Sequence, residues 1–231
     1  ENMTLFTSTD EGAMFSARFP HLVTIADTPL QKIDDEALAP LDVVFASTPS
    51  GVSSKLFPGL MNKGPKLIDL SGDFRLQDLE SYAHWYKKEP APAEVVSQAV
   101  YGLTEWNEAA IKDAPLIANP GCYPTAVLLS LLPLIKNKLI DPQFLVIDAK
   151  SGVSGAGNKP SQGTHYSETN ETISIYKVHE HQHIPEIEQA IKLFAGVDTK
   201  ITFTTHLVPM TRGILATSYA QVMPGVTQKQ L

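Results

Sequence analysis

The chain has 231 residues, of which 43% are hydrophobic, and this is enough apolar material for one large core or two modest ones. Its formal net charge of −7 is spread over segments of mixed sign without a Lys/Arg-rich run, which argues against non-specific binding to nucleic acid or to an anionic membrane. The longest apolar stretch, 126–135, is too short to span a bilayer, and the lone cysteine excludes an internal disulfide, so a reducing, cytoplasmic setting and small-molecule partners are expected.

The first half of the chain alternates short apolar runs with segments that suit helices. Apolar residues at three-to-four spacing predict helices over 11–19, 53–61 and 105–112. The predicted strands are 3–7, 21–25, 41–46, 66–69 and 116–118. This alternation predicts an α/β domain with a parallel, doubly wound sheet, whose binding crevice lies at the carboxyl ends of the strands.

Loops rich in small residues follow two of these strands. They are Thr7-Ser8-Thr9 and Ser47-Thr48-Pro49-Ser50-Gly51. Such loops can donate backbone N–H groups to phosphate, although the same residues are ordinary turn formers.

The second half is richer in β structure. Strands are predicted over 143–149, 172–178, 199–209 and 213–222, with one clear helix over 185–194 that begins with Pro185 and Glu186. A second domain of α+β type is the natural interpretation. With the boundary near Asn119, the two domains are 1–118 and 119–231.

The only cysteine, Cys122, lies where the strand-like run 116–118 turns through Pro120-Gly121 into a helix-like run. A thiol at a helix N-terminus is exposed to unpaired N–H groups and to the helix dipole, and both lower its pKa. A buried, inert cysteine is the plainer alternative. The flanking residues favour a reactive thiolate.

Three histidines alternate in sequence after the predicted strand 172–178. On an extended segment, His179, His181 and His183 project to one side, so a zinc site is one hypothesis. The other is that a histidine serves as the acid/base partner of Cys122, because thiolate nucleophiles are commonly assisted by imidazole.

Two arginines and a glycine-rich loop complete the candidates. Arg75 follows the strand 66–69 and should lie on the crevice side, and Arg212 precedes Gly213. The planar guanidinium suits carboxylate or phosphate. The loop 150–157 contains enough glycine to bring backbone close to a ligand.

The stretch 101–126, YGLTEWNEAAIKDAPLIANPGCYPTA, resembles the active-site signature of the N-acetyl-gamma-glutamyl-phosphate reductases, NADPH-dependent enzymes of arginine biosynthesis. Further matching segments are SGDFRL (71–76), SGVSGAG (151–157), HQHIPEI (181–187) and HLVPMTRGI (206–214). The resemblance implies a partial Rossmann-type parallel-sheet domain that binds NADP, followed by an α+β catalytic and dimerisation domain of the semialdehyde dehydrogenase type. It also implies a homo-oligomer and no metal.

The resemblance assigns a role to each matching residue. Cys122 matches the nucleophile, which takes up the γ-acyl group as a thioester before reduction to the semialdehyde, and His181 matches the general acid/base. The substrate-binding candidates are Arg75, Asn119, His183 and Arg212. The cofactor-binding candidates are Ser8, Ser47, Thr48, Pro49, Ser50, Ser151, Gly152, Ser154 and Gly155.

The sequence departs from the family pattern at its beginning. It has no glycine-rich phosphate loop of the type G-x-x-G-x-x-G, and its first strand resembles the family's second. We therefore expect the first strand with its loop, and the C-terminal portion, to be missing. Ser8 and Thr9 could bond the 2′-phosphate of NADP, while the nearby Asp10 weakens that argument.

Three alternatives stay open from the sequence. Aspartate-semialdehyde dehydrogenase shares the overall plan, but NPGCYPT and HQHIPEI fit it poorly. A cysteine hydrolase would use the same thiol and imidazole without a dinucleotide. A zinc-binding structural module would use the three alternating histidines.

Overall fold

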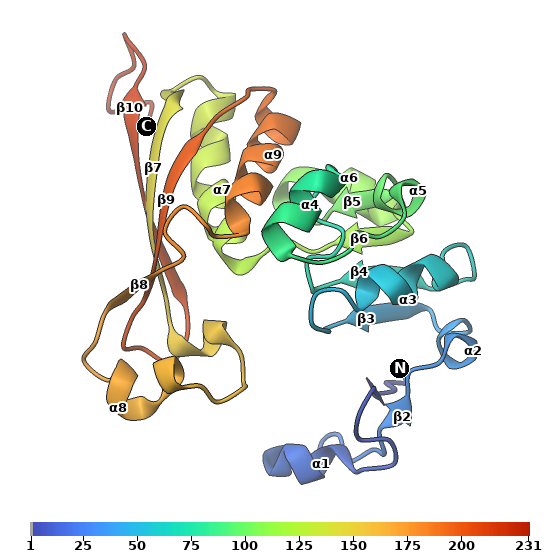
Figure 1. Ribbon diagram of the computed structural model, residues 1–231. Helices are drawn as coiled ribbons and strands as arrows, with labels where there is room; N and C mark the ends of the chain where they lie inside the picture. Colours follow the sequence, from blue (N-terminus) through green and yellow to red (C-terminus); the bar gives the residue numbers. More distant parts are fainter. Residues whose placement is uncertain (1) are drawn as a thin grey trace.

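The computed structural model describes residues 2–231, which form two domains with separate sheets (Figure 1). The strands are β1 (Phe6–Thr7), β2 (Gln31–Lys32), β3 (Val43–Ala46), β4 (Lys66–Asp69), β5 (Ala99–Tyr101), β6 (Leu116–Ala118), β7 (Ile140–Ser151), β8 (Ser174–Tyr176), β9 (Ile201–Leu207) and β10 (Ile214–Val222). The α-helices are α1 (Phe15–Arg18), α2 (Asp35–Leu38), α3 (Ser53–Leu60), α4 (Leu79–Tyr86), α5 (Ala93–Val96), α6 (Thr104–Asp113), α7 (Cys122–Lys136), α8 (Tyr166–Thr169) and α9 (His183–Ala195).

The first domain is built on a four-stranded parallel sheet in the order β3-β4-β6-β5. Parallel neighbours require crossovers, and α3 supplies the one between β3 and β4. Phe57, Leu67, Phe74 and Leu116 are fully buried in its core. The α/β expectation is thus confirmed, although the three-residue strand β5 was too short for an apolar run to predict it.

The N-terminal segment differs from the expectation. The predicted strand 21–25 is wrong, because Pro20 begins a 3-10 turn and Leu22 O accepts hydrogen bonds from the N–H groups of Ile25 and Ala26 at 2.9 Å. A proline at the first position of a turn fixes φ and favours this geometry. Strand β1 pairs in parallel only with β2, in a two-stranded sheet of their own.

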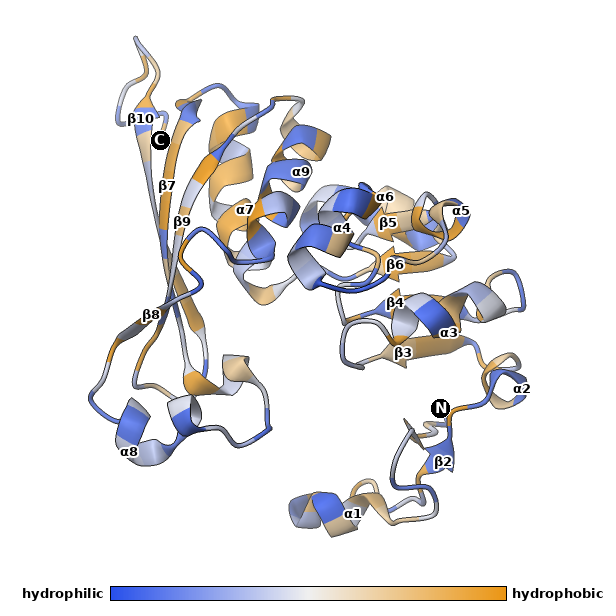
Figure 2. Cartoon of the chain, viewed as in Figure 1, coloured by the Kyte–Doolittle hydropathy of each residue, from blue (hydrophilic) through white to orange (hydrophobic). Residues whose placement is uncertain are grey.

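The second domain holds a mixed four-stranded sheet in the order β10-β7-β9-β8. Strand β7 runs parallel to β9, while β10 and β8 pair antiparallel with their neighbours. Helices α7 and α9 lie along one face of this sheet, on the side of the first domain (Figure 1). Apolar colour follows α7 and the strands in Figure 2, in agreement with a core that contains Val127, Leu131, Ile187 and Phe203.

The two domains share packing at their junction. Tyr101 and Leu103, which precede the predicted boundary near Asn119, are buried in the core of the second domain. Gln189 of α9 accepts a hydrogen bond from Gln77 N at 2.9 Å and donates to Arg75 O at 2.8 Å. Within residues 2–231, the helices all fall short of the length and apolarity needed to cross a membrane.

Candidate active site

The thiol of Cys122 lies at the N-terminus of α7, directly after the turn that leaves β6. Gly121 is the N-cap, with an extended backbone at φ −65° and ψ 160°, and Cys122 is the first helical residue. The cysteine side chain is exposed. The local pattern of strand, Pro-Gly turn and helix therefore places the thiol as the sequence predicts.

The pKa of the Cys122 thiol lies below its ordinary value. Partial burial of the thiol on its own raises the pKa, but the neighbouring ring of His183 and its charge favour the thiolate and outweigh this effect. The backbone N–H groups of Tyr123 and Cys122 also favour the thiolate. A negative sulfur at a helix N-terminus is the state that these donors and the helix dipole stabilise.

His183 is the imidazole that faces the thiol. It is the first residue of α9 and is buried, and its Nδ1 lies 2.7 Å from Glu186 Oε2. Burial lowers the pKa of His183, but Glu186 and Cys122 raise it by a larger amount. The net pKa of His183 therefore lies above the ordinary value. A Cβ at Gly121 would lie 2.2 Å from His183 Cε1, so only glycine leaves room for this ring.

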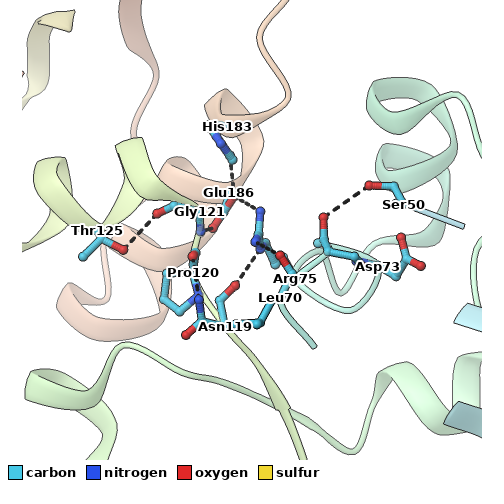
Figure 3. A network of polar contacts seen from close by, with 12 residues as sticks. Ser50, Leu70, Asp73, Arg75, Asn119, Pro120, Gly121, Thr125, His183 and Glu186 are labelled. Atoms are coloured by element: carbon cyan, nitrogen blue, oxygen red, sulfur yellow. Dashed lines mark hydrogen bonds and ion pairs between the residues drawn. The ribbon is translucent and has the colours of Figure 1, made fainter. Parts of the chain in front are cut away.

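Glu186 is the centre of a buried polar network (Figure 3). Its Oε1 accepts hydrogen bonds from the Tyr101 hydroxyl at 2.9 Å and from Gly121 N–H at 2.8 Å. Its Oε2 lies 2.7 Å from His183 Nδ1 and 3.8 Å from Arg75 Nη1. Burial alone would raise the pKa of this carboxyl, but Arg75, His183 and the hydrogen bonds hold it at about 2. The group is therefore a carboxylate with satisfied oxygens.

His181 is not placed as we expected. It is buried, and its Nδ1 accepts a hydrogen bond from the backbone N–H of His183 at 3.2 Å. Burial and the neighbouring charge of His183 lower the pKa of His181 to about 3, so it is neutral near pH 7. The aromatic rings around it belong to Tyr123, Tyr176 and Phe203. Of the two histidines, His183 lines the cavity together with Cys122, whereas His181, the predicted general acid/base, is not among the lining residues.

A cavity of about 490 Å³ opens at Cys122. Of the predicted site residues, Ser50, Arg75, Asn119, Cys122 and His183 line it. The structure therefore brings both domains to one cavity.

Arg75 uses two of its donors to hold the backbone around this cavity. Its Nε donates to Asn119 O at 2.7 Å and its Nη2 donates to Leu70 O at 3.1 Å (Figure 3). Arg212, the other predicted arginine, is exposed on the loop between β9 and β10 and lies outside the cavity. The position of Arg212 therefore does not support its predicted contact with a substrate in this cavity.

The predicted cofactor loop after β3 retains free donors. Within residues 2–231, the backbone N–H groups of Ser47, Thr48 and Ser50 make no hydrogen bond. Pro49 has no N–H to offer. Because this loop lies at the carboxyl end of a parallel strand and Ser50 lines the cavity of Cys122, these residues fit a bound dinucleotide.

The glycine-rich loop after β7 is packed differently. The N–H of Gly152 donates to Gly213 O at 2.9 Å, and that of Val153 donates to Met210 O at 2.9 Å. A Cβ at Gly152 would lie 2.8 Å from a backbone atom of the facing loop. Gly152 thus allows the loop after β7 and the loop between β9 and β10 to pack closely against each other. The remaining predicted cofactor residues of this loop are Ser151, Ser154 and Gly155, and Ser8 lies exposed after β1.

Several residues in and behind the cavity were not predicted from the sequence. Glu186 was predicted only to open a helix, although its spacing of three residues from His183 places both on one helical face. Tyr101 could not be linked to Glu186, because 85 residues separate them. The lining residues without a predicted role include Trp85, Tyr86 and Lys177.

The three alternating histidines do not form a metal site. Among the residues that the structure describes, no group of three His, Cys, Asp or Glu side chains is placed to hold a metal ion. His179 is exposed with a φ of 56°, whereas His181 and His183 are buried. The hypothesis of a zinc module is therefore not supported.

The chain combines a domain with a parallel sheet, a domain with a mixed sheet, and a thiol next to an imidazole at their junction. These features define a protein of the semialdehyde dehydrogenase class. Two family models match the chain: "Semialdehyde dehydrogenase, NAD binding domain" over residues 1–114 and "Semialdehyde dehydrogenase, dimerisation domain" over residues 122–231. The solved structures with similar folds include aspartate semialdehyde dehydrogenase II from Vibrio cholerae, with a TM-score of 0.67 at 13% identity, covering 100% of this chain and 68% of that one. Another is aspartate semialdehyde dehydrogenase with NADP from Candida albicans, with a TM-score of 0.63 at 15% identity, covering 95% and 63%. At such identities the likeness shows the fold alone.

Curated relatives are much closer in sequence. The chain is 54% identical to N-acetyl-gamma-glutamyl-phosphate reductase of Geobacillus thermodenitrificans over 94% of this chain and 63% of that protein. It is 53% identical to the reductase of Brevibacillus brevis and 50% identical to that of Bacillus subtilis, in both cases over 100% of this chain and 67% of the relative. The chain belongs to the N-acetyl-gamma-glutamyl-phosphate reductase family, and it spans 63% to 67% of the length of these relatives.

Proposed function

We propose that the full-length protein reduces N-acetyl-γ-glutamyl phosphate to N-acetyl-glutamate semialdehyde and phosphate with NADPH, as a step of arginine biosynthesis in the cytoplasm. The observation that carries this proposal is the position of Cys122 at the N-terminus of α7, exposed to a cavity that His183 also lines. An acyl phosphate is already activated, so it requires a soft nucleophile, anion-stabilising donors and a proton carrier. The described residues offer all three.

In this mechanism Cys122 begins as a thiolate beside an imidazolium. The sulfur attacks the γ-carbonyl carbon, a C–S bond forms, and the C–O bond to phosphate breaks, which leaves a thioester on Cys122 and free phosphate. Glu186 keeps His183 charged and orients its ring toward the sulfur. Backbone N–H groups at the start of α7 stabilise negative charge at the reacting centre.

His183 then handles the proton of reduction. NADPH, when bound, supplies the hydride that the thioester carbon requires. His183 gives its Nε2 proton to the oxygen that becomes negative, and the product is a thiohemiacetal on Cys122. On collapse, His183 takes the proton back, the C–S bond breaks, and the semialdehyde leaves while the thiolate is restored. The buried, neutral His181 supports His183 N–H rather than carrying this proton.

The cofactor is proposed to be NADP, held by the loop Ser47–Ser50 through its free N–H groups. Ser151, Gly152, Ser154 and Gly155 are proposed to contact it from the second domain, and Ser8 to meet its 2′-phosphate. Asn119, whose side chain lies at the cavity, is proposed to bond the substrate.

The test is phosphate-dependent reduction of NADP with N-acetyl-glutamate semialdehyde, measured on the full-length protein. Cys122→Ser should lower kcat by about 10⁴-fold or more, as loss of a nucleophile does elsewhere. Ser130→Ala, an exposed position on the same helix, is the matched control and should leave the rate unchanged. Acyl phosphate consumption without NADPH would instead favour a cysteine hydrolase.

We further propose that the protein is a homo-oligomer that associates through the mixed sheet. The face of this sheet opposite α7 and α9 exposes Phe144, Leu215 and Tyr219, whose exposed fractions are 48%, 60% and 55%. Apolar side chains gathered on one sheet face are typical of an interface. Sedimentation of Tyr219→Asp should give a smaller species than the unsubstituted protein, and an unchanged species would contradict this interface.

A further inference from the structure

Among the described residues, the charged side chains that line the cavity at Cys122 are all basic. Its described lining residues include Arg75, Lys177 and His183, and none of them is an Asp or Glu. Such a cavity favours an anionic ligand. The proposed substrate has two anionic ends, the acyl phosphate and the α-carboxylate.

Two of the three cationic groups are already engaged by protein. Arg75 donates to two backbone carbonyls and lies 3.8 Å from Glu186. His183 Nδ1 lies 2.7 Å from Glu186 Oε2, and the ring lines the cavity together with Cys122. Lys177 is different, because its Nζ makes one hydrogen bond, to the neutral Gln182 Oε1 at 2.9 Å, and no ion pair within residues 2–231. An ammonium has three donors, so Lys177 can still bond a ligand.

The fold fixes Lys177 beside the site. It directly follows β8 and has a φ of 46°, a left-handed conformation that few non-glycine residues adopt. Its partner Gln182 is the N-cap of α9 and immediately precedes His183. The side-chain hydrogen bond thus ties the ammonium to the start of the helix that carries the acid/base residue.

We propose that Lys177 binds the α-carboxylate of the substrate, the anionic end that does not react. This rests on the proposed function. Phosphate must leave next to the sulfur, where His183 and the N–H groups of α7 lie, whereas the donors of Lys177 contact Gln182 and neither Cys122 nor His183. A carboxylate that keeps its charge throughout the reaction suits a single compact ammonium. Tyr86, whose buried hydroxyl makes no hydrogen bond of ordinary geometry, lines the same cavity and gives the substrate tail a further polar neighbour.

The reverse reaction separates the two ends of the substrate, because the semialdehyde carries the carboxylate and phosphate is added independently. The experiment measures kcat and both KM values for full-length Lys177→Met. We expect the KM for N-acetyl-glutamate semialdehyde to rise about tenfold or more, with kcat and the KM for phosphate nearly unchanged, because a contact that is equal in ground and transition states affects binding alone. Lys177→Arg should restore part of the affinity.

Lys138→Met is the matched control, because Lys138 is also an exposed lysine with positive φ (56°) but lies at the far end of α7 from Cys122. It should leave all three constants unchanged. A rise confined to the KM for phosphate would overturn the assignment to the carboxylate, and three unchanged constants in Lys177→Met would overturn any role in binding. Absence of turnover in the unsubstituted protein would overturn the proposed function itself, a result distinct from these.

Discussion

The carboxylate of Glu186 accepts a hydrogen bond of 2.8 Å from the backbone N–H of Gly121, the residue before Cys122. The same carboxylate holds His183 at 2.7 Å. One buried side chain therefore sets both the start of α7 and the direction of the imidazole. The geometry between Cys122 and His183 depends on it.

Glu186→Gln should lower stability and change its pH dependence. The pKa of Glu186 is about 2 in the folded protein, below that of an unfolded glutamate. Its charge therefore contributes stability above the unfolded pKa, near 4.3, and this contribution is lost as the pH falls through about 2. At pH 7 the variant should lose on the order of 3 kcal/mol of unfolding free energy, because a buried partner of Arg75 and His183 is removed.

Urea unfolding of both proteins at pH 7, 4 and 3 checks this prediction. The difference in unfolding free energy should shrink at the lower pH values. If the difference in unfolding free energy were the same at all three pH values, Glu186 would carry no net charge in the folded protein.

His183→Asn should raise the pKa of Cys122, because the variant removes the charge that favours the thiolate. The measurement is the rate of alkylation by iodoacetamide as a function of pH. His181→Phe keeps the aromatic packing of the position, and its alkylation profile should stay close to that of the unsubstituted protein. A large shift in the His181 variant alone would return the role of thiol partner to His181.

Gly121→Ala should slow alkylation of Cys122 by about tenfold or more near pH 7, since a methyl group would occupy the place of the imidazole. Gly163→Ala is a suitable control, because a Cβ there meets no atom within 4 Å and φ is not positive. Equal alkylation rates in the two variants would mean that the ring of His183 moves without consequence for the thiol.

Arg75→Lys should destabilise the protein by about 2 kcal/mol, even though the charge is kept, because an ammonium cannot reproduce the separate bonds of the guanidinium to Asn119 O and Leu70 O. Thermal unfolding measures this effect. Arg18→Lys, at a side chain that is 60% exposed, should change Tm little. Similar Tm values for both variants would argue against a structural role for the two hydrogen bonds of the Arg75 guanidinium.

The position of Cys122 was predictable because it depends on local signals, a strand, a Pro-Gly turn and a helix within a few residues. The choice between His181 and His183 was not, since it depends on where α9 begins. The sequence predicted that helix from 185, but it begins at His183, which leaves His181 in the preceding turn and turns its ring toward Phe203.

The sequence also could not show which residues line the cavity. Lys177 and Arg212 both lie in polar loops, and only the path of the loop after β8 brings Lys177 to the cavity. The prediction of a strand over 21–25 was wrong because the preceding proline, Pro20, starts a 3-10 turn in spite of the short apolar run. An apolar run of this length does not by itself distinguish a strand from a turn, and here Val23 and Ile25 are 52% and 78% exposed.

Two of the groups that face Glu186, Arg75 and Tyr101, come from the first domain, whereas the thiol whose charge they indirectly support belongs to the second. The reactivity of Cys122 is therefore a reporter of whether the two domains are seated on each other. A reagent that labels this one sulfur atom therefore reports how the two domains pack against each other.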